Sequence, residues 1–62
     1  MGFNNMLSEL HSFKMFRRKY WMPSWYIYYD ETRGEIFNQD GKHYKFTIHD
    51  FIDEEWEEFK GV

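Results

Sequence analysis

A dense aromatic segment, RRKYWMPSWYIYY at residues 17–29, constrains the fold of this chain more than any other feature. It holds six aromatic side chains and three cations, and Pro23 divides it. After the proline, residues 25–30 alternate in a pattern typical of a strand with two different faces. We expect the core face to carry Trp25, Ile27 and Tyr29. The opposite face carries Tyr26, Tyr28 and Asp30.

The length of the chain limits how much core it can build. A domain of about 60 residues buries only about 60% of the surface that its unfolded chain exposes, and this chain has 62 residues and no cysteine for a disulfide. Its 42% of hydrophobic residues exceeds what disordered chains contain. No apolar run suits a signal peptide or a membrane span. We expect one folded domain over residues 1–62, located in a reducing cytoplasm.

The residues before the aromatic segment predict a helix of about ten residues. Asn4 and Asn5 are favoured N-cap residues. Apolar residues follow at helical spacing, namely Met6, Leu7, Leu10 and Phe13. One face of this helix is therefore expected to pack on the rest of the domain.

Short antiparallel strands are predicted for the middle of the chain. Residues 14–21 resemble an edge strand that ends before Pro23. Residues 35–38 form another, and Asp40-Gly41 is a strong hairpin signal. Residues 43–48 alternate, which assigns Tyr44, Phe46 and Ile48 to the core.

The last segment, HDFIDEEWEEF, fits two structures. It is either one helix, or a single helical turn followed by a short strand from Trp56, which we expect to be a packing residue. The predicted fold class is α+β: an N-terminal helix packed on an antiparallel sheet of four to five strands, with a short C-terminal helical turn.

The charges are distributed unevenly. The net charge of −3 argues against general binding of nucleic-acid polymers. A basic cluster is formed by Lys14, Arg17, Arg18 and Lys19. An acidic segment is formed by Asp50, Asp53, Glu54, Glu55, Glu57 and Glu58. The two are either separate solvated faces or attract each other within or between subunits.

Two blocks of the chain resemble a known family. They are GFNNMLSEL with FRRKYW, and HDFIDEEW. They are similar to the phage-encoded second Thoeris anti-defence family, in which a Phe-x-x-x-Leu-x-x-Leu helix leads into Ala-Arg-Lys-Gly-Trp and the chain closes with Asp-[Ile/Met/Leu]-Leu-Ala-x-Asp-Trp. The first block is matched by Phe3, Leu7, Leu10, Arg18, Lys19 and Trp21. The second is matched by Asp50, Ile52, Glu55 and Trp56, with Glu55 in place of aspartate.

The resemblance implies a phage immune-evasion protein in the cytoplasm of the infected host cell. Members of the family are small α+β homo-oligomers that sequester cyclic-nucleotide signals, such as cyclic ADP-ribose derivatives, without cleaving them. Here a short hairpin around Asp40-Gly41 replaces the family's long insertion, and Tyr20 replaces the glycine before Trp21. The implied partners are a cyclic nucleotide and further copies of the chain, as a dimer or tetramer.

The residues themselves also suit a nucleotide. Flat bases stack on aromatic rings, and phosphates bind cations. The candidate ligand-binding residues are Arg17, Arg18, Lys19, Trp21, Tyr26, Tyr28 and Asp50. Trp21 is either a core residue or a stacking platform, and Tyr26 and Tyr28 suit a ligand or a subunit interface. Nanomolar binding needs about 12 kcal/mol, which favours a site enclosed between subunits.

Catalysis has little support in the sequence. His11, His43 and His49 fall in different elements, and the spacing of His49 to its acidic neighbours fits no known metal motif. The chain has no Gly-rich phosphate loop and no nucleophile motif. We expect a protein that is not an enzyme and that needs neither metal nor cofactor.

Two alternatives stay open. In one, the acidic segment, with Trp56 and Phe59, docks on a basic groove of a host enzyme and inhibits it. In the other, the chain is a small oligomeric module from a phage accessory region without enzymatic activity.

Overall fold

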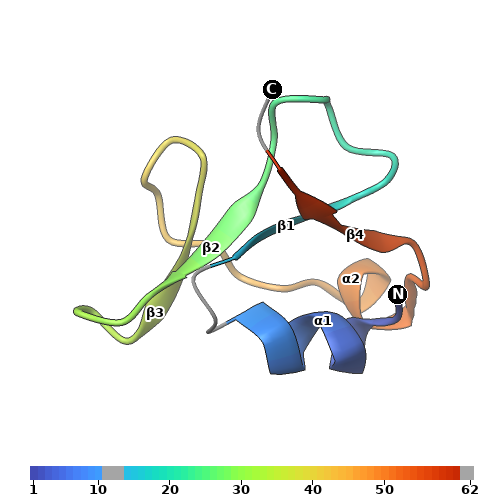
Figure 1. Cartoon of the computed structure of the whole chain (residues 1–62), viewed down its shortest axis with the longest axis horizontal. Helices are drawn as coiled ribbons and strands as arrows, with labels where there is room; N and C mark the ends of the chain where they lie inside the picture. Colours follow the sequence, from blue (N-terminus) through green and yellow to red (C-terminus); the bar gives the residue numbers. More distant parts are fainter. Residues whose placement is uncertain (11–13, 61–62) are drawn as a thin grey trace.

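The fold, described for residues 1–10 and 14–60 by a computed structural model, places two helices on one side of a four-stranded antiparallel sheet (Figure 1). The elements in chain order are α1 (Phe3–Leu10), β1 (Met15–Arg18), β2 (Ile27–Asp30), β3 (Glu35–Asn38), α2 (Ile48–Ile52) and β4 (Trp56–Phe59). The strand order is β3-β2-β1-β4. The α+β class, the N-terminal helix, the antiparallel sheet and the short C-terminal helix are thereby confirmed.

Strand β1 lies inside the sheet, so the prediction of an edge strand was wrong. Its Phe16 lies opposite Ile27 of β2, and its Arg18 lies opposite Trp56 of β4. Pro23 follows β1 in the connecting loop and therefore removes no hydrogen bond from the ladder. Of the two alternatives for residues 49–59, the structure has the helical turn followed by a strand from Trp56.

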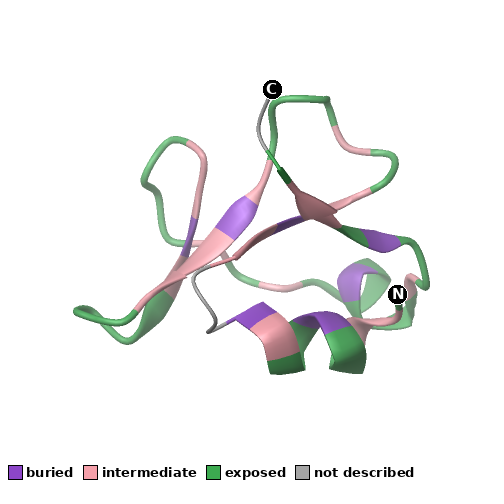
Figure 2. Ribbon diagram, in the orientation of Figure 1, coloured by how far each residue is buried: buried purple, intermediate pink, exposed green. Residues whose placement is uncertain are grey.

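The core lies between α1 and the sheet (Figure 2). It consists of Met6, Leu10, Phe16, Ile27 and Trp56. The indole Nε1 of Trp56 donates a hydrogen bond to the Asp50 carbonyl oxygen at 3.0 Å, so the largest core side chain leaves no polar atom unpaired. The prediction that Trp56 is a packing residue is confirmed.

Helix α1 begins earlier than predicted. Because it starts at Phe3, Asn4 and Asn5 lie in its first turn and are not N-caps. Leu7 is exposed, although it was predicted on the buried face with Met6. Phe13 lies outside the described residues.

Two predicted core residues are at the surface. Trp25 comes before β2 begins and is 47% exposed, so its side chain is not held against the helix side of the sheet. Ile48 is 64% exposed because it opens α2 instead of continuing a strand. Ile27 is fully buried and Tyr29 packs against the core, as predicted.

Residues 43–48 do not form the predicted strand. A single bridge joins His43 to Phe37 of β3, and the Tyr44 N–H donates to the Ile36 carbonyl oxygen. After these contacts the segment leaves the sheet edge and crosses toward α2 (Figure 1). The alternating residues Tyr44 and Phe46 nevertheless pack against the core, as predicted.

Candidate functional site

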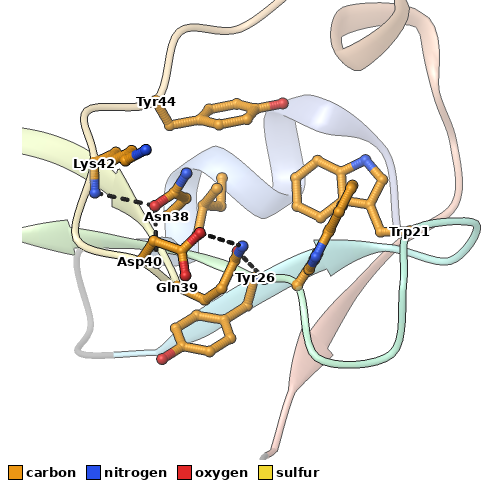
Figure 3. A pocket seen from close by; sticks show the side chains of 9 residues that line it. Trp21, Tyr26, Asn38, Gln39, Asp40, Lys42 and Tyr44 are labelled. Atoms are coloured by element: carbon orange, nitrogen blue, oxygen red, sulfur yellow. Dashed lines mark hydrogen bonds between the residues drawn. The ribbon is translucent and has the colours of Figure 1, made fainter.

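An open hollow of about 410 Å³ lies between the loop that leads into β2 and the turn that follows β3. Its aromatic walls are the rings of Trp21, Trp25, Tyr26 and Tyr44. In Figure 3 the Tyr44 and Tyr26 rings lie on opposite sides, with Trp21 at one end and the turn residues Asn38 to Lys42 at the other. We call this space the first hollow. Its size is in the range typical of small-molecule sites.

Contacts on both sides hold Trp21 in the wall. Its ring centroid lies 5.5 Å from that of Trp56 and 5.7 Å from that of Tyr44. Arg17 Nη2 donates to the Trp21 carbonyl oxygen at 2.6 Å, and the Trp21 N–H donates to the Arg18 carbonyl oxygen at 3.0 Å. Trp21 is thus both a partner of the core and part of the surface of the hollow.

The turn opposite Trp21 is ordered by its own side chains. The Asn38 side-chain oxygen accepts hydrogen bonds from the backbone N–H groups of Asp40 and Lys42, at 2.9 and 3.0 Å. Gly41 supplies the positive φ of 77° that closes the turn. Gln39 Oε1 accepts from the Tyr26 N–H at 3.2 Å and so ties the turn to the end of the loop before β2.

Lys42 carries the cation of the first hollow. Its side chain is exposed, and its ammonium pairs with no carboxylate in the part of the chain that the structure describes. An unpaired ammonium beside aromatic walls can bind a phosphate without first breaking an internal ion pair.

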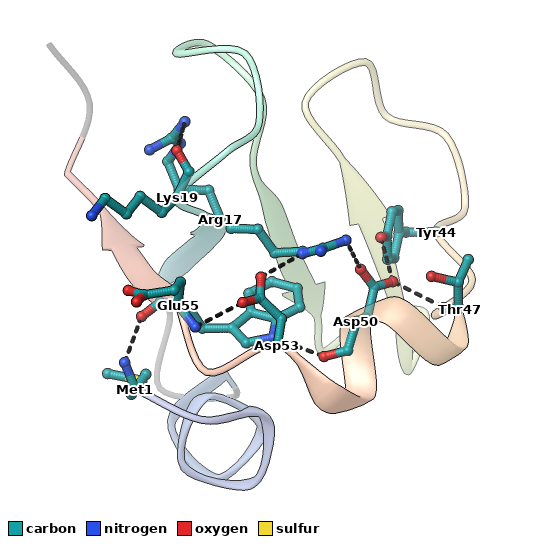
Figure 4. Close-up of polar contacts among 10 residues, drawn as sticks. Met1, Arg17, Lys19, Tyr44, Thr47, Asp50, Asp53 and Glu55 are labelled. Atoms are coloured by element: carbon teal, nitrogen blue, oxygen red, sulfur yellow. Dashed lines mark hydrogen bonds and ion pairs between the residues drawn. The ribbon is translucent and has the colours of Figure 1, made fainter.

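A second cluster of polar groups surrounds the buried Asp50, between α2 and β1 (Figure 4). Asp50 is 1% exposed and accepts hydrogen bonds from Arg18 Nη1 at 3.0 Å, the Tyr44 hydroxyl at 2.7 Å and the Thr47 N–H at 2.9 Å. Arg18 Nε also donates to Asp53 at 2.6 Å. We call this set of five residues the Asp50 network.

The contacts within the Asp50 network affect the protonation of Tyr44 and the availability of Arg18. Burial, together with the hydrogen bond to Asp50, raises the pKa of Tyr44 well above its ordinary value, so the hydroxyl remains protonated. The Arg18 guanidinium is occupied by two carboxylates. These groups connect α2 to β1 and also anchor Tyr44, which is a wall of the first hollow.

The structure does not bring the predicted ligand-binding residues together at one site. Trp21 and Tyr26 line the first hollow. Arg18 and Asp50 lie together, as a direct ion pair within the Asp50 network. Arg17, Lys19 and Tyr28 lie elsewhere: Arg17 is paired with Glu57, Lys19 is exposed on the loop after β1, and Tyr28 lines a different hollow.

Sequence reasoning missed the polar side of the first hollow. Asn38, Gln39 and Lys42 had been treated as parts of a short hairpin. The Asp40-Gly41 signal located the turn, but its position beside the loop before β2 depends on tertiary contacts such as the hydrogen bond between Gln39 and Tyr26. The paired basic and acidic segments do attract each other within the chain, through Arg17 with Glu57 and Arg18 with Asp50 and Asp53.

Comparison with known proteins found no matching family model, no similar curated protein and no similar solved structure. The relationship to the Thoeris anti-defence family therefore stays a prediction. Within residues 1–10 and 14–60, no helix has the length and apolar character needed to cross a membrane. Over the same residues, no three acidic, histidine or cysteine side chains are grouped in a way that suits a metal ion.

Proposed function

We propose that this protein binds a nucleotide, with a cyclic-nucleotide messenger as the leading case, in the first hollow, and holds it without cleaving it. The observation that carries the proposal is the combination of several aromatic rings with the unpaired ammonium of Lys42 around one hollow. A base would stack on the rings while Lys42 meets a phosphate. This would make the protein a sequestering agent in the cytoplasm of an infected host cell.

Binding without cleavage is supported by the groups that line the first hollow. Its titratable lining groups are Asp40, Lys42 and the two tyrosines, Tyr26 and Tyr44. The Tyr44 hydroxyl is engaged by Asp50, and its pKa is raised by burial and by that hydrogen bond. A general acid or base must lie within hydrogen-bond reach of the proton that it transfers, and the Tyr44 hydroxyl is already engaged by Asp50.

The energies indicate how tight a single site can be. One stacked base contributes about 1–3 kcal/mol and one charged hydrogen bond about 1.5–3 kcal/mol. Together these give about 2.5–6 kcal/mol, which corresponds to a Kd between about 15 mM and 40 μM. Tighter capture requires further enclosure of the ligand, which a second copy of the chain would supply.

We further propose that the protein is a homo-oligomer, with a dimer as the simplest case. Helix α2 exposes Ile48, Phe51 and Ile52 at helical spacing, and Ile48 and Ile52 are 64% and 66% exposed. Contiguous exposed apolar side chains on a small protein mark an association surface. Leu7 of the neighbouring helix α1 is also exposed.

Binding is tested by calorimetry with a panel of purified cyclic nucleotides, followed by heating and mass spectrometry of the released ligand. We expect binding of at least one member and release of the intact molecule. Trp25→Ala and Lys42→Ala should weaken binding at least about fivefold. The matched control is Tyr20→Ala, because Tyr20 is more exposed than Trp25 and does not line the first hollow. No binding across the panel, or chemically altered ligand, contradicts the proposal.

Association is tested by light scattering of the intact protein. We expect a mass of at least two chains, and a single-chain mass for the Ile48→Lys/Ile52→Lys variant. Met22→Lys is the control, because Met22 is similarly exposed but lies outside both helices. A monomeric wild-type protein at micromolar concentration would contradict the proposal.

The structure bears on the alternative of an acidic inhibitor of a host enzyme. Asp50 and Asp53 pair with Arg18, and Glu57 pairs with Arg17. Half of the acidic segment is therefore engaged within the chain, which leaves a smaller negative surface for a basic partner. We favour the nucleotide-binding function for this reason.

A further inference from the structure

The sheet has a second face, turned away from α1 and α2, on which a row of apolar side chains crosses all four strands. Residues opposite each other in neighbouring antiparallel strands share a face. The pairs are Phe37 with Tyr28, Tyr28 with Met15, and Met15 with Phe59. The core residues Phe16 and Ile27 alternate to the other side. We call the row the open-face row.

Aromatic rings cluster along the open-face row. The ring of Tyr26 stacks on that of Phe59, with centroids 4.5 Å apart and an interplanar angle of 23°. The Tyr28 ring lies 6.3 Å from that of Tyr26 and 6.2 Å from that of Phe37. Arg33 covers Phe37 at 5.0 Å and closes one end of the row. Phe37 is buried, so the partly exposed surface beside the row lies around Tyr26 and Tyr28.

A second hollow of about 360 Å³ opens at this point. Its lining includes Met15, Tyr28 and Lys14, and it shares Tyr26 and Gln39 with the first hollow. Tyr26 is thus a common wall between two neighbouring hollows. Each hollow combines aromatic surface with one lysine, Lys42 in the first and Lys14 in the second.

We propose that the two hollows together bind a short single-stranded nucleic-acid segment, with one base in each hollow and Tyr26 between them. A single strand offers planar bases joined by phosphates, and base–aromatic stacking tolerates any sequence because every base has a π-face. The proposal rests on the proposed function in one respect, namely that a base enters the first hollow. It adds a polymer ligand and a second site.

The charges of the molecule determine how this binding responds to salt. The net charge of −3 precludes a broad electrostatic attraction to nucleic acid, so stacking supplies most of the affinity. Lys14 and Lys42 each meet one phosphate, and Lys14 must share its ammonium with Glu9, to which it is hydrogen-bonded at 3.0 Å. For two neutralised phosphates of a single strand, the slope of log K against log salt is about −1.4.

The experiment uses fluorescence anisotropy with end-labelled thymidine nucleotides as a mononucleotide, a dinucleotide and a hexanucleotide. We expect the dinucleotide to bind about tenfold more tightly than the mononucleotide, which corresponds to one additional stacked base. In the Tyr28→Ala protein this ratio should fall to about one. The control is again Tyr20→Ala, and thermal unfolding verifies that each variant is folded.

A second variant tests the proposal without altering the row. Lys14→Gln changes an exposed side chain, and it should reduce the salt slope by about 0.7. Equal affinity for mononucleotide and dinucleotide, or an unchanged ratio in folded Tyr28→Ala, overturns the inference and leaves the proposed function standing. Oligonucleotide binding that depends on Tyr28 supports the inference even when every cyclic nucleotide fails to bind. Binding of a labelled proline-rich peptide in place of the oligonucleotides would identify the surface as a protein-docking site and overturn the inference.

Discussion

Asp50→Asn is expected to destabilise the protein strongly, although the two side chains have nearly the same shape. The carboxylate of Asp50 receives three donors, from Arg18, Tyr44 and Thr47. Asparagine offers one oxygen and an NH₂ group. Whichever way the amide is turned, its NH₂ faces a donor that the carboxylate previously accepted.

The size of the effect follows from these contacts. Loss of the charged hydrogen bond to Arg18 costs about 1.5–3 kcal/mol, and the unpaired buried donor adds about 1–3 kcal/mol. Arg18 keeps Asp53 as a partner, and its side chain is 23% exposed. Both facts make the total loss of stability smaller than the sum of these two costs. We expect a loss of about 2–4 kcal/mol. A domain of this length has a total stability of about 3–9 kcal/mol, so the melting temperature should fall by about 10–25 °C.

Urea and thermal unfolding, followed by circular dichroism and tryptophan fluorescence, measure this loss. Glu54→Gln is the matched control, because it removes the same charge from an exposed position of the same segment. A double-mutant cycle with Arg18→Met should give a coupling energy above about 1 kcal/mol. If the free energy of unfolding of Asp50→Asn lies within about 1 kcal/mol of that of the control, the Asp50 network does not stabilise the fold as argued.

Three further predictions follow from other contacts. Arg17→Met should speed hydrogen exchange at the Trp21 amide, measured by NMR, because Arg17 no longer holds the Trp21 carbonyl. Gly41→Ala should lower stability by about 1 kcal/mol in thermal unfolding and Gly41→Asn by less, because φ is +77° there and the Cβ meets no atom within 4 Å. Partial burial opposes ionisation of Asp53, yet its hydrogen bond from Arg18 holds the Asp53 pKa below the ordinary value. The stabilisation that ionised Asp53 contributes is therefore complete above about pH 4 and is lost as the pH falls through the lowered pKa. The urea midpoint of Asp53→Asn should consequently decline less steeply in acid than that of the wild-type protein.

The parts of the fold that the sequence predicted well are those determined by local pattern. The helix near the N-terminus, the strand at residues 35–38 and the turn at Asp40-Gly41 depend on spacing and on the backbone freedom of glycine. Trp56 as a packing residue follows from its size and its position after α2. Each of these depends on neighbours close in the chain.

The errors have a common physical cause, which is pairing between distant segments. Strand β1 is interior because β4, about forty residues later, supplies its second partner through Arg17 opposite Glu57. The alternation of residues 43–48 could not reveal that only His43 would find a bridge to β3. Trp25 alternates in phase with Ile27 but lies before the strand starts, so no neighbouring strand directs it inward.

The same long-range pairing changes which cations are available to a ligand. Arginines beside aromatic residues suggested a phosphate site, but folding brings Asp50 and Asp53 onto Arg18 and Glu57 onto Arg17. A phosphate that approached Arg18 would have to displace a buried carboxylate, which costs more than one charged hydrogen bond returns. Lys42, at the rim of the first hollow, carries no such cost, whereas Lys14 at the second hollow is shared with Glu9. The arginines instead hold the loop and helix against which the aromatic walls are built.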